Sequence, residues 1–193
     1  EYILNLSEGV FTCGGNQLWL DGALSYNHEF KPSNELIDFL KNKLEQSPYP
    51  VRAGNHIEDR GSMLNFSIVG RDCSIEDRLK YFEYDCETNE RVKISKEICS
   101  TWENLDAVIG GQISIDITPK GMNKSQVLSE VKKFYADDSY YFIGDRTMQG
   151  GNDYPLAKVM NETDNCHVFQ AGKPSAEDGY LDTKIILEKL DNE

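Results

Sequence analysis

Two carboxylates in one glycine-rich loop are the residues of this chain best suited to bind a metal ion. Asp145 and Asp153 lie in the segment 144–153, which follows the apolar run 140–143. A short apolar run predicts a buried strand, and α/β sheets bind ligands at the carboxyl ends of such strands. Mg²⁺ prefers a few carboxylates together with water and phosphate oxygens. The loop therefore predicts a magnesium site, whereas the alternative is a solvated turn, because Asp, Asn and Gly also form turns.

Three arginines could bind a phosphate group. Arg60 precedes a predicted strand, Arg71 ends it, and Arg78 lies in the first turn of the next predicted helix, where backbone N–H groups favour anions. Guanidinium groups bind phosphate oxygens in a bidentate way that lysine does not match. Under the alternative interpretation the three are surface arginines that pair with nearby acids. These acids are Glu58, Asp59, Asp72, Glu76 and Asp77.

Three further polar residues could complete such a site. Ser114 and Asp116 alternate on a predicted strand, so they face the same side and could bind sugar hydroxyls. Lys124 lies at the start of a predicted helix, where a cation opposes the helix dipole. A lysine there could pair with a phosphate dianion, and the alternative is an ordinary first-turn lysine.

The elements that position the arginines combine antiparallel strands with helices. Short strands are predicted at 2–6 and 10–13, with a hairpin continuing through 17–20. Ser33 or Asn34 should cap a helix whose apolar stripe begins at Leu36. A strand is predicted over 62–69, followed by a helix with a capping box at 74–77. A less periodic helix over 89–98 and a hairpin of 107–109 with 113–117 complete this part.

The C-terminal part has a different order. A helix over 123–134 is followed by the strand 140–143, the acidic loop, a helix, the strand 166–169 and a helix over 182–190. Alternation of this kind predicts a parallel sheet with helices on its faces. We therefore expect an α+β module inserted into a doubly wound α/β domain.

The composition excludes several classes of function. Hydrophobic residues make up 39% and charged residues 27% of the 193 residues, as in soluble globular proteins. The net charge of −13 argues against nucleic acid or an anionic membrane as partner, because either needs a basic surface. Five widely spaced cysteines without a C-x-x-C pair predict a reduced protein and argue against zinc. No apolar run approaches about 18 residues, so we expect no membrane span and a cytoplasmic location.

Five motifs follow one another in a fixed order along the chain. They are IEDRGSMLN at 57–65, GRDCS at 70–74 with EDR at 76–78, GGQISID at 110–116, GMNK at 121–124, and the loop of Asp145. In order, spacing and flanks these motifs resemble the eukaryotic-type phosphomannomutases of the haloacid dehalogenase superfamily. The resemblance covers most of residues 1–193.

The resemblance implies a fold and a role for each candidate residue. It implies a haloacid-dehalogenase-like Rossmannoid α/β core, incomplete at its N-terminus, with an inserted α+β cap domain. Residues 1–16 and 122–193 would belong to the core and residues 17–121 to the cap. Lys124 would be the catalytic core lysine, and Asp145 would hold Mg²⁺ beside Asp153. The residues implied to hold the phosphorylated hexose are Arg60, Arg71, Arg78, Ser114 and Asp116.

The implied activity interconverts mannose 1-phosphate and mannose 6-phosphate, with a hexose 1,6-bisphosphate as activator. A mutase must hold the non-reacting phosphate while the other end reacts, and then accept the flipped ligand. A phosphatase of the same superfamily needs only the reacting end. The arginines therefore favour a mutase, whereas a sugar phosphatase and a non-catalytic sugar-phosphate-binding relic are the alternatives.

Two features depart from the family pattern. The family's nucleophile and acid/base residue form an Asp-x-Asp motif, and no Asp-x-Asp occurs in these 193 residues. We therefore expect the nucleophile segment to lie outside this chain, because covalent catalysis needs that carboxylate. His56 stands where the family has an apolar residue at the cap's dimer interface, so a homodimer through the cap is left open. The sequence does not distinguish mannose from glucose.

Overall fold

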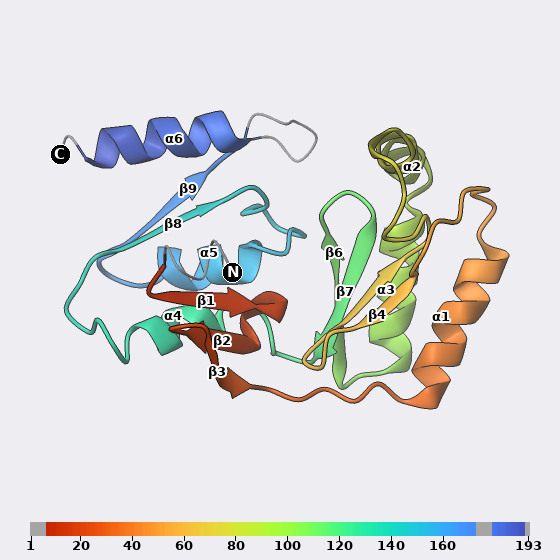
Figure 1. Ribbon diagram of the computed structural model, residues 1–193, viewed down its shortest axis with the longest axis horizontal. Coiled ribbons are helices and arrows are strands. Elements are labelled where there is room, and N and C mark those ends of the chain that lie inside the picture. The colour runs from red at the N-terminus through yellow and green to blue at the C-terminus, as the bar shows by residue number, and fades with distance from the viewer. Residues whose placement is uncertain (1–6, 173–178, 192–193) are drawn as a thin grey trace. The chain divides into compact units, whose positions relative to one another are not determined.

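The computed structural model describes residues 7–172 and 179–191, which belong to two compact units, Glu1–Met122 and Asn123–Glu193 (Figure 1). Each unit has its own sheet structure and its own hydrophobic cluster. The strand expected at 2–6 lies outside the described residues. The core and cap boundaries expected at residues 16 and 121 stay a prediction.

The first unit begins with a three-stranded antiparallel sheet. Its strands pair in the order β1 (Gly9–Thr12), β2 (Gln17–Leu20) and β3 (Ala23–Asn27), and the short 3₁₀ helix η1 (Cys13–Gly15) joins the first two. The hairpin predicted through 17–20 is confirmed. Strand β3 was not predicted, although Asp21-Gly22 is a strong hairpin signal. Both residues have positive φ, 50° and 75°, as the two central positions of a type I′ turn require.

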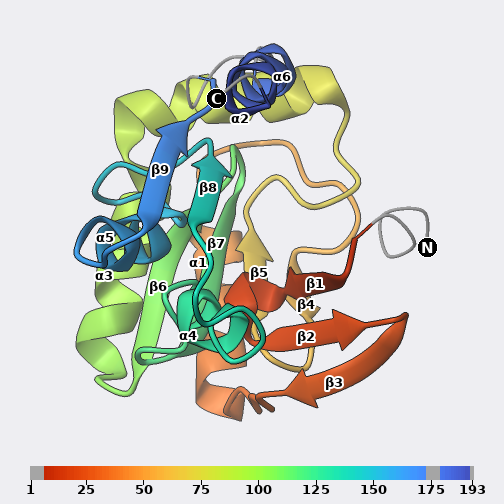
Figure 2. The same ribbon diagram turned by 90° about the vertical axis from the view of Figure 1, so that its left-hand side faces the viewer.

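A four-stranded antiparallel sheet forms the centre of the first unit (Figure 2). Its order is β4 (Ile57–Asp59), β5 (Leu64–Ser67), β7 (Ser114–Pro119) and β6 (Leu105–Gly110). Three helices accompany it: α1 (Asn34–Gln46), α2 (Ile75–Thr88) and α3 (Glu90–Thr101). Figure 1 shows α1 and α3 on one side of the sheet.

The two faces of this sheet differ because successive side chains point in opposite directions. Leu64 and Phe66 of β5 pair with Ile117 and Ile115 of β7, and all four join the cluster that includes α1 and α3. Asn65 and Asp116, one position along, point to the opposite face. The sheet is therefore apolar towards its helices and polar on the other side.

The caps predicted for two helices are confirmed. Ser33 Oγ accepts the backbone N–H of Leu36 at 3.2 Å at the start of α1. Ser74 Oγ accepts the backbone N–H of Asp77 at 3.0 Å at the start of α2. Each cap satisfies a backbone donor that a helix start leaves without an intrahelical partner. The Ser74 cap fixes the start of α2 and thereby places Arg78 in the first turn of the helix.

The second unit contains a parallel strand pair, as the sequence predicted. Strands β8 (Tyr140–Gly144) and β9 (Cys166–Gln170) pair in parallel, and α5 (Tyr154–Asn161) lies between them in sequence. Leu128 of α4 (Gln126–Val131) packs with Tyr140, Leu156 and Met160. Helix α6 (Gly179–Leu190) follows β9 in the sequence.

The helix predicted over 123–134 is shorter than expected. The side chain of Asn123 accepts the backbone N–H of Ser125 at 3.0 Å, an Asx turn that competes with helical hydrogen bonding. At the other end, Phe134 and Tyr135 both donate to the carbonyl of Val131. Only 126–131 are α-helical, and Lys124 therefore precedes the helix.

Within the described part of the chain, no helix has the length and apolar character needed to cross a membrane.

Candidate functional site

A row of polar residues crosses the four-stranded sheet on the face away from its helices. Glu58 of β4 pairs with Asn65 of β5, and Asn65 pairs with Asp116 of β7. Directly paired residues in antiparallel strands point to the same face. Strand register thus brings Glu58 of β4 and Asp116 of β7 onto one face of the sheet, on either side of Asn65, although they are far apart in the sequence.

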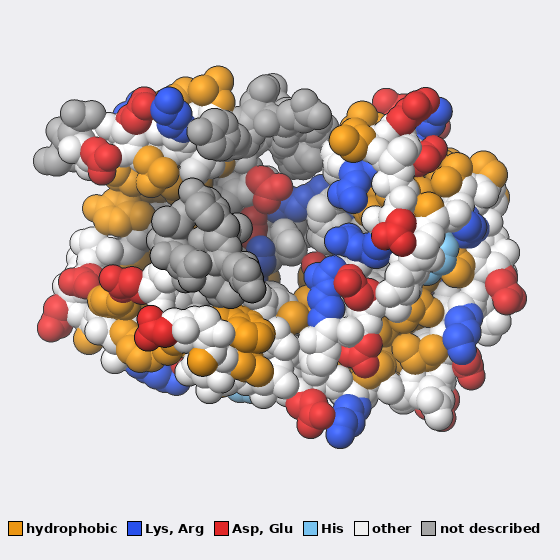
Figure 3. Space-filling model, viewed as in Figure 1, with side chains coloured by type: hydrophobic (Ala, Val, Ile, Leu, Met, Phe, Trp, Pro, Cys, Tyr) orange, Lys and Arg blue, Asp and Glu red, His pale blue; other side chains and the backbone are white. Residues whose placement is uncertain are grey.

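Two of the three predicted arginines converge on the first residue of this row. Arg60 donates from Nε to Glu58 Oε2 at 2.9 Å, and its Nη2 lies 2.5 Å from the same oxygen. Arg71 Nε lies 3.8 Å from that oxygen as well. In the space-filling view, basic side chains gather beside the β6–β7 hairpin with acidic side chains among them (Figure 3). Pairing with Glu58 belongs to the alternative interpretation, but convergence on one oxygen also brings both cations to a single point.

Arg78 lies in the first turn of α2, where its backbone N–H donates to the carbonyl of Ser74 at 3.0 Å. Its side chain is partly exposed. A role for Arg78 in the same anion site stays a prediction.

Asn65 is the residue at the centre of the row, and sequence reasoning gave it no role. It is only 2% exposed, and its amide nitrogen donates to Asp116 Oδ1 at 2.6 Å. The carboxylate of Asp116 can only accept there, so the amide nitrogen must face it and the carbonyl oxygen must point elsewhere. That carbonyl oxygen has no hydrogen-bond partner among the described residues. A buried acceptor without a donor costs free energy, and a ligand hydroxyl or a water molecule would satisfy it.

Ser114 is placed on the same strand face as Asp116 but is buried, with 6% exposure. Its hydroxyl donates to the carbonyl of Gly110 at 3.0 Å, across the tip of the β6–β7 hairpin. This bond leaves its oxygen lone pairs as acceptors. Its predicted role in holding sugar hydroxyls is untested.

A buried ion pair supports the hairpin that carries Ser114. Arg91 of α3 and Asp85 of α2 have side chains only 3% and 7% exposed, with Nε and Oδ2 2.8 Å apart. Arg91 Nη1 also donates to the carbonyls of Gly111 at 3.1 Å and Ser114 at 3.3 Å. The sequence signal was present, since Arg91 precedes Ile94 and Ile98 at helical spacing and so falls within an apolar stripe.

Cys13 is a further residue beside the arginine pair that the sequence did not single out. Its thiol has two possible acceptors, Gln17 Oε1 at 3.4 Å and the carbonyl of Arg60 at 3.9 Å. Burial raises the pKa of the Cys13 thiol above its ordinary value. The thiol is therefore protonated at neutral pH, and the carbonyl of Arg60 also accepts a hydrogen bond from Gln17 Nε2 at 3.2 Å.

In the second unit, the predicted metal ligands and the predicted lysine form one cluster. Asp153 is 4% exposed, and its Oδ1 lies 2.5 Å from Lys124 Nζ. Its Oδ2 accepts the backbone N–H of Arg146 at 3.0 Å. Burial alone would raise the pKa of Asp153, but the bonds from Lys124 and Arg146 outweigh it and hold that pKa below its usual value. Asp153 is thus ionised and ties the loop to Lys124.

Asp145 behaves in the opposite way. Partial burial raises the pKa of Asp145, and the charge of nearby Asp153 raises it further. The negative charge of Asp153 thus disfavours the ionised form of Asp145, and a divalent cation would stabilise both carboxylates in their charged form. Asn152, next to Asp153, adds a buried side-chain oxygen without a hydrogen-bond partner among residues 7–172 and 179–191.

These residues fit Mg²⁺ as a partial ligand set. No cluster of three or more His, Cys, Asp or Glu side chains suited to a metal occurs in the described part of the chain. Mg²⁺ commonly takes only one or two protein carboxylates, with water and phosphate oxygens as its other ligands. The roles of Asp145 and Asp153 as Mg²⁺ ligands stay a prediction.

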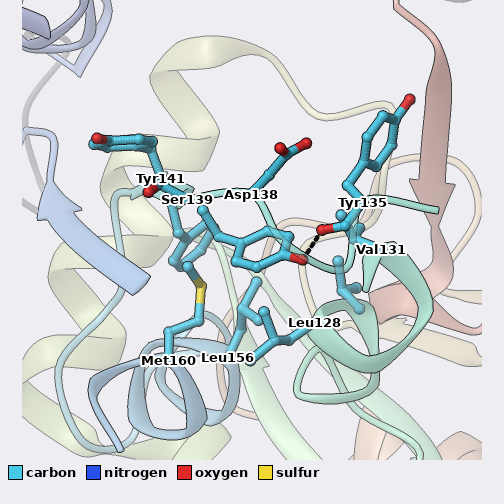
Figure 4. Close-up of a pocket in the computed structure, with 11 residues that line it drawn as sticks. Leu128, Val131, Tyr135, Asp138, Ser139, Tyr141, Leu156 and Met160 are labelled. Carbon is cyan, nitrogen blue, oxygen red and sulfur yellow. Dashed lines mark hydrogen bonds between the residues drawn. The ribbon is translucent and has the colours of Figure 1, made fainter. Parts of the chain in front are cut away.

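The cavity beside β8 has a different character (Figure 4). It has a volume of about 300 Å³ and is walled by Leu128 and Val131 of α4 together with Leu156 and Met160 of α5. Asp138 is the one acidic residue in its described lining, which contains no Lys, Arg or His. A cavity of this composition suits apolar side chains and gives no phosphate site.

Comparison with solved structures identifies the fold. The chain superposes on an IMP-nucleotidase of Plasmodium falciparum with a TM-score of 0.57 and 16% identity, covering 96% of this chain and 48% of that one. It superposes on SMU.1108c of Streptococcus mutans with a TM-score of 0.53 and 17% identity, covering 92% and 75%. The predicted class, a haloacid-dehalogenase-like α/β fold with an α+β part, is confirmed.

Sequence comparison identifies the family. The chain is 39% identical over 158 residues to a phosphomannomutase of Encephalitozoon cuniculi, covering 81% of this chain and 59% of the relative. It is 36% identical to a phosphomannomutase of Drosophila melanogaster, covering 62% of this chain and 48% of the relative. It is 39% identical to a phosphomannomutase of Arabidopsis thaliana, covering 63% of this chain and 49% of the relative. The chain thus spans about half to three fifths of the length of these curated relatives. The family model for eukaryotic phosphomannomutase matches residues 23–172, so this chain belongs to the eukaryotic phosphomannomutase family.

Proposed function

We propose that this chain supplies the sugar-phosphate-binding part of a phosphomannomutase that interconverts mannose 1-phosphate and mannose 6-phosphate. The observation that carries the proposal is the convergence of Arg60 and Arg71 on one oxygen of Glu58, at the end of the polar row. Two guanidinium groups at one point suit a phosphate dianion. Asn65 and Asp116, farther along the row, suit the hydroxyl groups of a sugar attached to that phosphate.

A mutase explains this site better than a phosphatase does. The arginines belong to the first unit, whereas the acidic loop and Lys124 belong to the second unit, which has its own core. A phosphatase needs to hold only the phosphate that reacts at the metal. A mutase must also hold the second phosphate of a hexose 1,6-bisphosphate, and a separate pair of arginines supplies that binding.

In the second unit we propose that Asp145 and Asp153 hold Mg²⁺, with Asn152 as a further oxygen donor. When bound, Mg²⁺ would offset the negative charge of the phosphate that reacts. Lys124 orients Asp153 through its 2.5 Å contact and places a positive charge beside the loop. The nucleophile and the acid/base aspartate would come from outside these 193 residues.

A strand that carries such a nucleophile has a place to pair. In the described part of the chain β8 pairs only with β9, so its other edge can accept a further strand. The apolar cavity of α4 and α5 adjoins β8, and Tyr141 is 52% exposed. An added apolar strand would cover this surface.

Ligand binding to the 193-residue chain tests the proposal. Isothermal titration should detect mannose 1-phosphate and mannose 6-phosphate but not mannose. Arg71→Ala should lower the affinity for both mannose phosphates at least about tenfold, because a charged hydrogen bond contributes about 1.5–3 kcal/mol. Lys41→Ala is the matched control, since Lys41 is an exposed cation on α1. Equal binding of mannose, or no effect of Arg71→Ala, would refute the proposal.

Homodimer formation through the cap is also part of the proposal. Strand β4 is at the edge of its sheet, and His56 precedes it with Nδ1 2.9 Å from the carbonyl of Ser67. We propose that two copies associate near this edge and that the polar ring weakens the association. Sedimentation should show a dimer that His56→Leu tightens, and a monomer for both proteins would exclude it.

A further inference from the structure

Glu58 occupies the point at which the two site arginines meet. Its Oε2 takes both contacts from Arg60, at 2.5 and 2.9 Å, and the longer contact from Arg71 at 3.8 Å. A carboxylate presents oxygens to guanidinium groups in the same geometry as a phosphate does.

The Glu58 carboxylate can separate from the two arginines at little cost in free energy. The backbone of Glu58 is fixed, because β4 pairs with β5 at Asn65. Its side chain, however, is 38% exposed, and those of Arg60 and Arg71 are 32% and 34% exposed. Partly exposed ion pairs are weak, with a typical contribution of about 0–1 kcal/mol, so a dianion can compete with the carboxylate for the arginines.

We propose that Glu58 is an internal counter-ion that occupies the arginine pair in the ligand-free protein and is displaced by the phosphate of the ligand. The inference rests on the proposed function and adds a residue that sets its affinity. Glu58 keeps the two guanidinium groups together before the ligand arrives, since like charges would otherwise separate them. It also opposes the bound dianion, so a phosphate that must be released and bound again is not trapped.

The test is the affinity of the 193-residue chain for inorganic phosphate and for mannose 6-phosphate, measured by isothermal titration. Glu58→Gln keeps the shape of the side chain and removes its charge. Glu58→Gln should raise the affinity for both ligands about tenfold, because a like charge a few ångström away no longer opposes the dianion. Glu83→Gln, on an exposed position of α2, changes the net charge equally and should leave both affinities unchanged.

A second variant separates charge from contact. Glu58→Ala cannot bond to either arginine, and it should also tighten phosphate binding. If only Glu58→Gln binds phosphate more tightly, the effect comes from the new amide group and the inference is overturned. Unchanged or weaker phosphate binding by both variants would also overturn it. If wild type binds neither ligand, the proposed function fails as well. If wild type binds mannose 6-phosphate and neither variant binds it more tightly, only the role of Glu58 fails.

Discussion

Arg91→Met should remove the support of the β6–β7 hairpin and with it the sugar-binding part of the site. Arg91 is the partner of buried Asp85 and the donor to the carbonyls of Gly111 and Ser114. Methionine fills similar space without charge or donors. The substitution therefore leaves an uncompensated carboxylate at 7% exposure and unpaired carbonyl groups at the hairpin tip.

The expected loss of stability follows from this burial. Removal of one partner from a buried ion pair costs about 3–5 kcal/mol, whereas an exposed pair contributes about 0–1 kcal/mol. Asp85 keeps one bond, from the backbone N–H of Arg91 at 2.7 Å, so we expect a loss near the lower end of that range. The hairpin should also become more mobile, and the affinity for mannose 6-phosphate should fall more than that for inorganic phosphate.

Urea unfolding followed by tryptophan fluorescence is the assay. Both tryptophans, Trp19 and Trp102, lie in the first unit, so their fluorescence reports on the unit that contains Arg91. Lys80→Met is the control, since Lys80 pairs with Glu76 on the exposed face of α2. A loss of about 1 kcal/mol or less for Arg91→Met, similar to that of the control, would refute the structural role of the pair.

Three further predictions concern the polar row and the acidic loop. Asn65→Asp would set two carboxylates against each other at Asp116 and should destabilise the first unit by about 1–3 kcal/mol, measured by the same fluorescence assay. Asp145→Asn should stabilise the metal-free chain at neutral pH, because a carboxyl whose folded pKa is raised costs stability once it ionises. The same variant should lose the rise in melting temperature that Mg²⁺ gives wild type, and retention of that rise would exclude Asp145 as a ligand. Lys124→Met should destabilise the chain at neutral pH, by circular dichroism. The lowered pKa of Asp153 contributes stability above its unfolded pKa of about 3.9, so the difference should disappear as the pH falls through the folded pKa, and a difference that persists in acid would contradict this linkage.

The periodic parts of the fold were predictable from the sequence. Serine residues predicted the starts of α1 and α2 as N-caps. Two apolar runs, each followed by a predicted helix, predicted the parallel strands β8 and β9. The errors occurred where short-range polar chemistry competes with a periodic pattern. Asn123 shortened the predicted helix by forming an Asx turn. Strand β4 is only three residues long and is defined by its pairing with β5, which the sequence does not display.

The candidate site was predictable in its residue types but not in its pairings. Arginines and aspartates near strand ends and helix starts indicated an anion site and a metal site. Strand register, which brings Glu58, Asn65 and Asp116 into one row, depends on contacts between distant segments. Asn65 was missed for that reason, since an asparagine in an alternating strand gives no sign that its carbonyl oxygen lacks a donor. Arg91 was missed because a single charged residue in a helix is usually exposed.

Burial decides what each arginine–carboxylate pair in the first unit can do. The Arg91–Asp85 pair is almost completely excluded from water, so its separation would leave a buried charge, and it can serve only to hold structure. The Arg60–Glu58 pair has a similar short contact, but about a third of each side chain is exposed, so water or a ligand can replace either partner at little cost. The same chemistry therefore gives a fixed support beneath the hairpin and an exchangeable contact at the end of the polar row. A phosphate ligand should displace the second pair and leave the first intact.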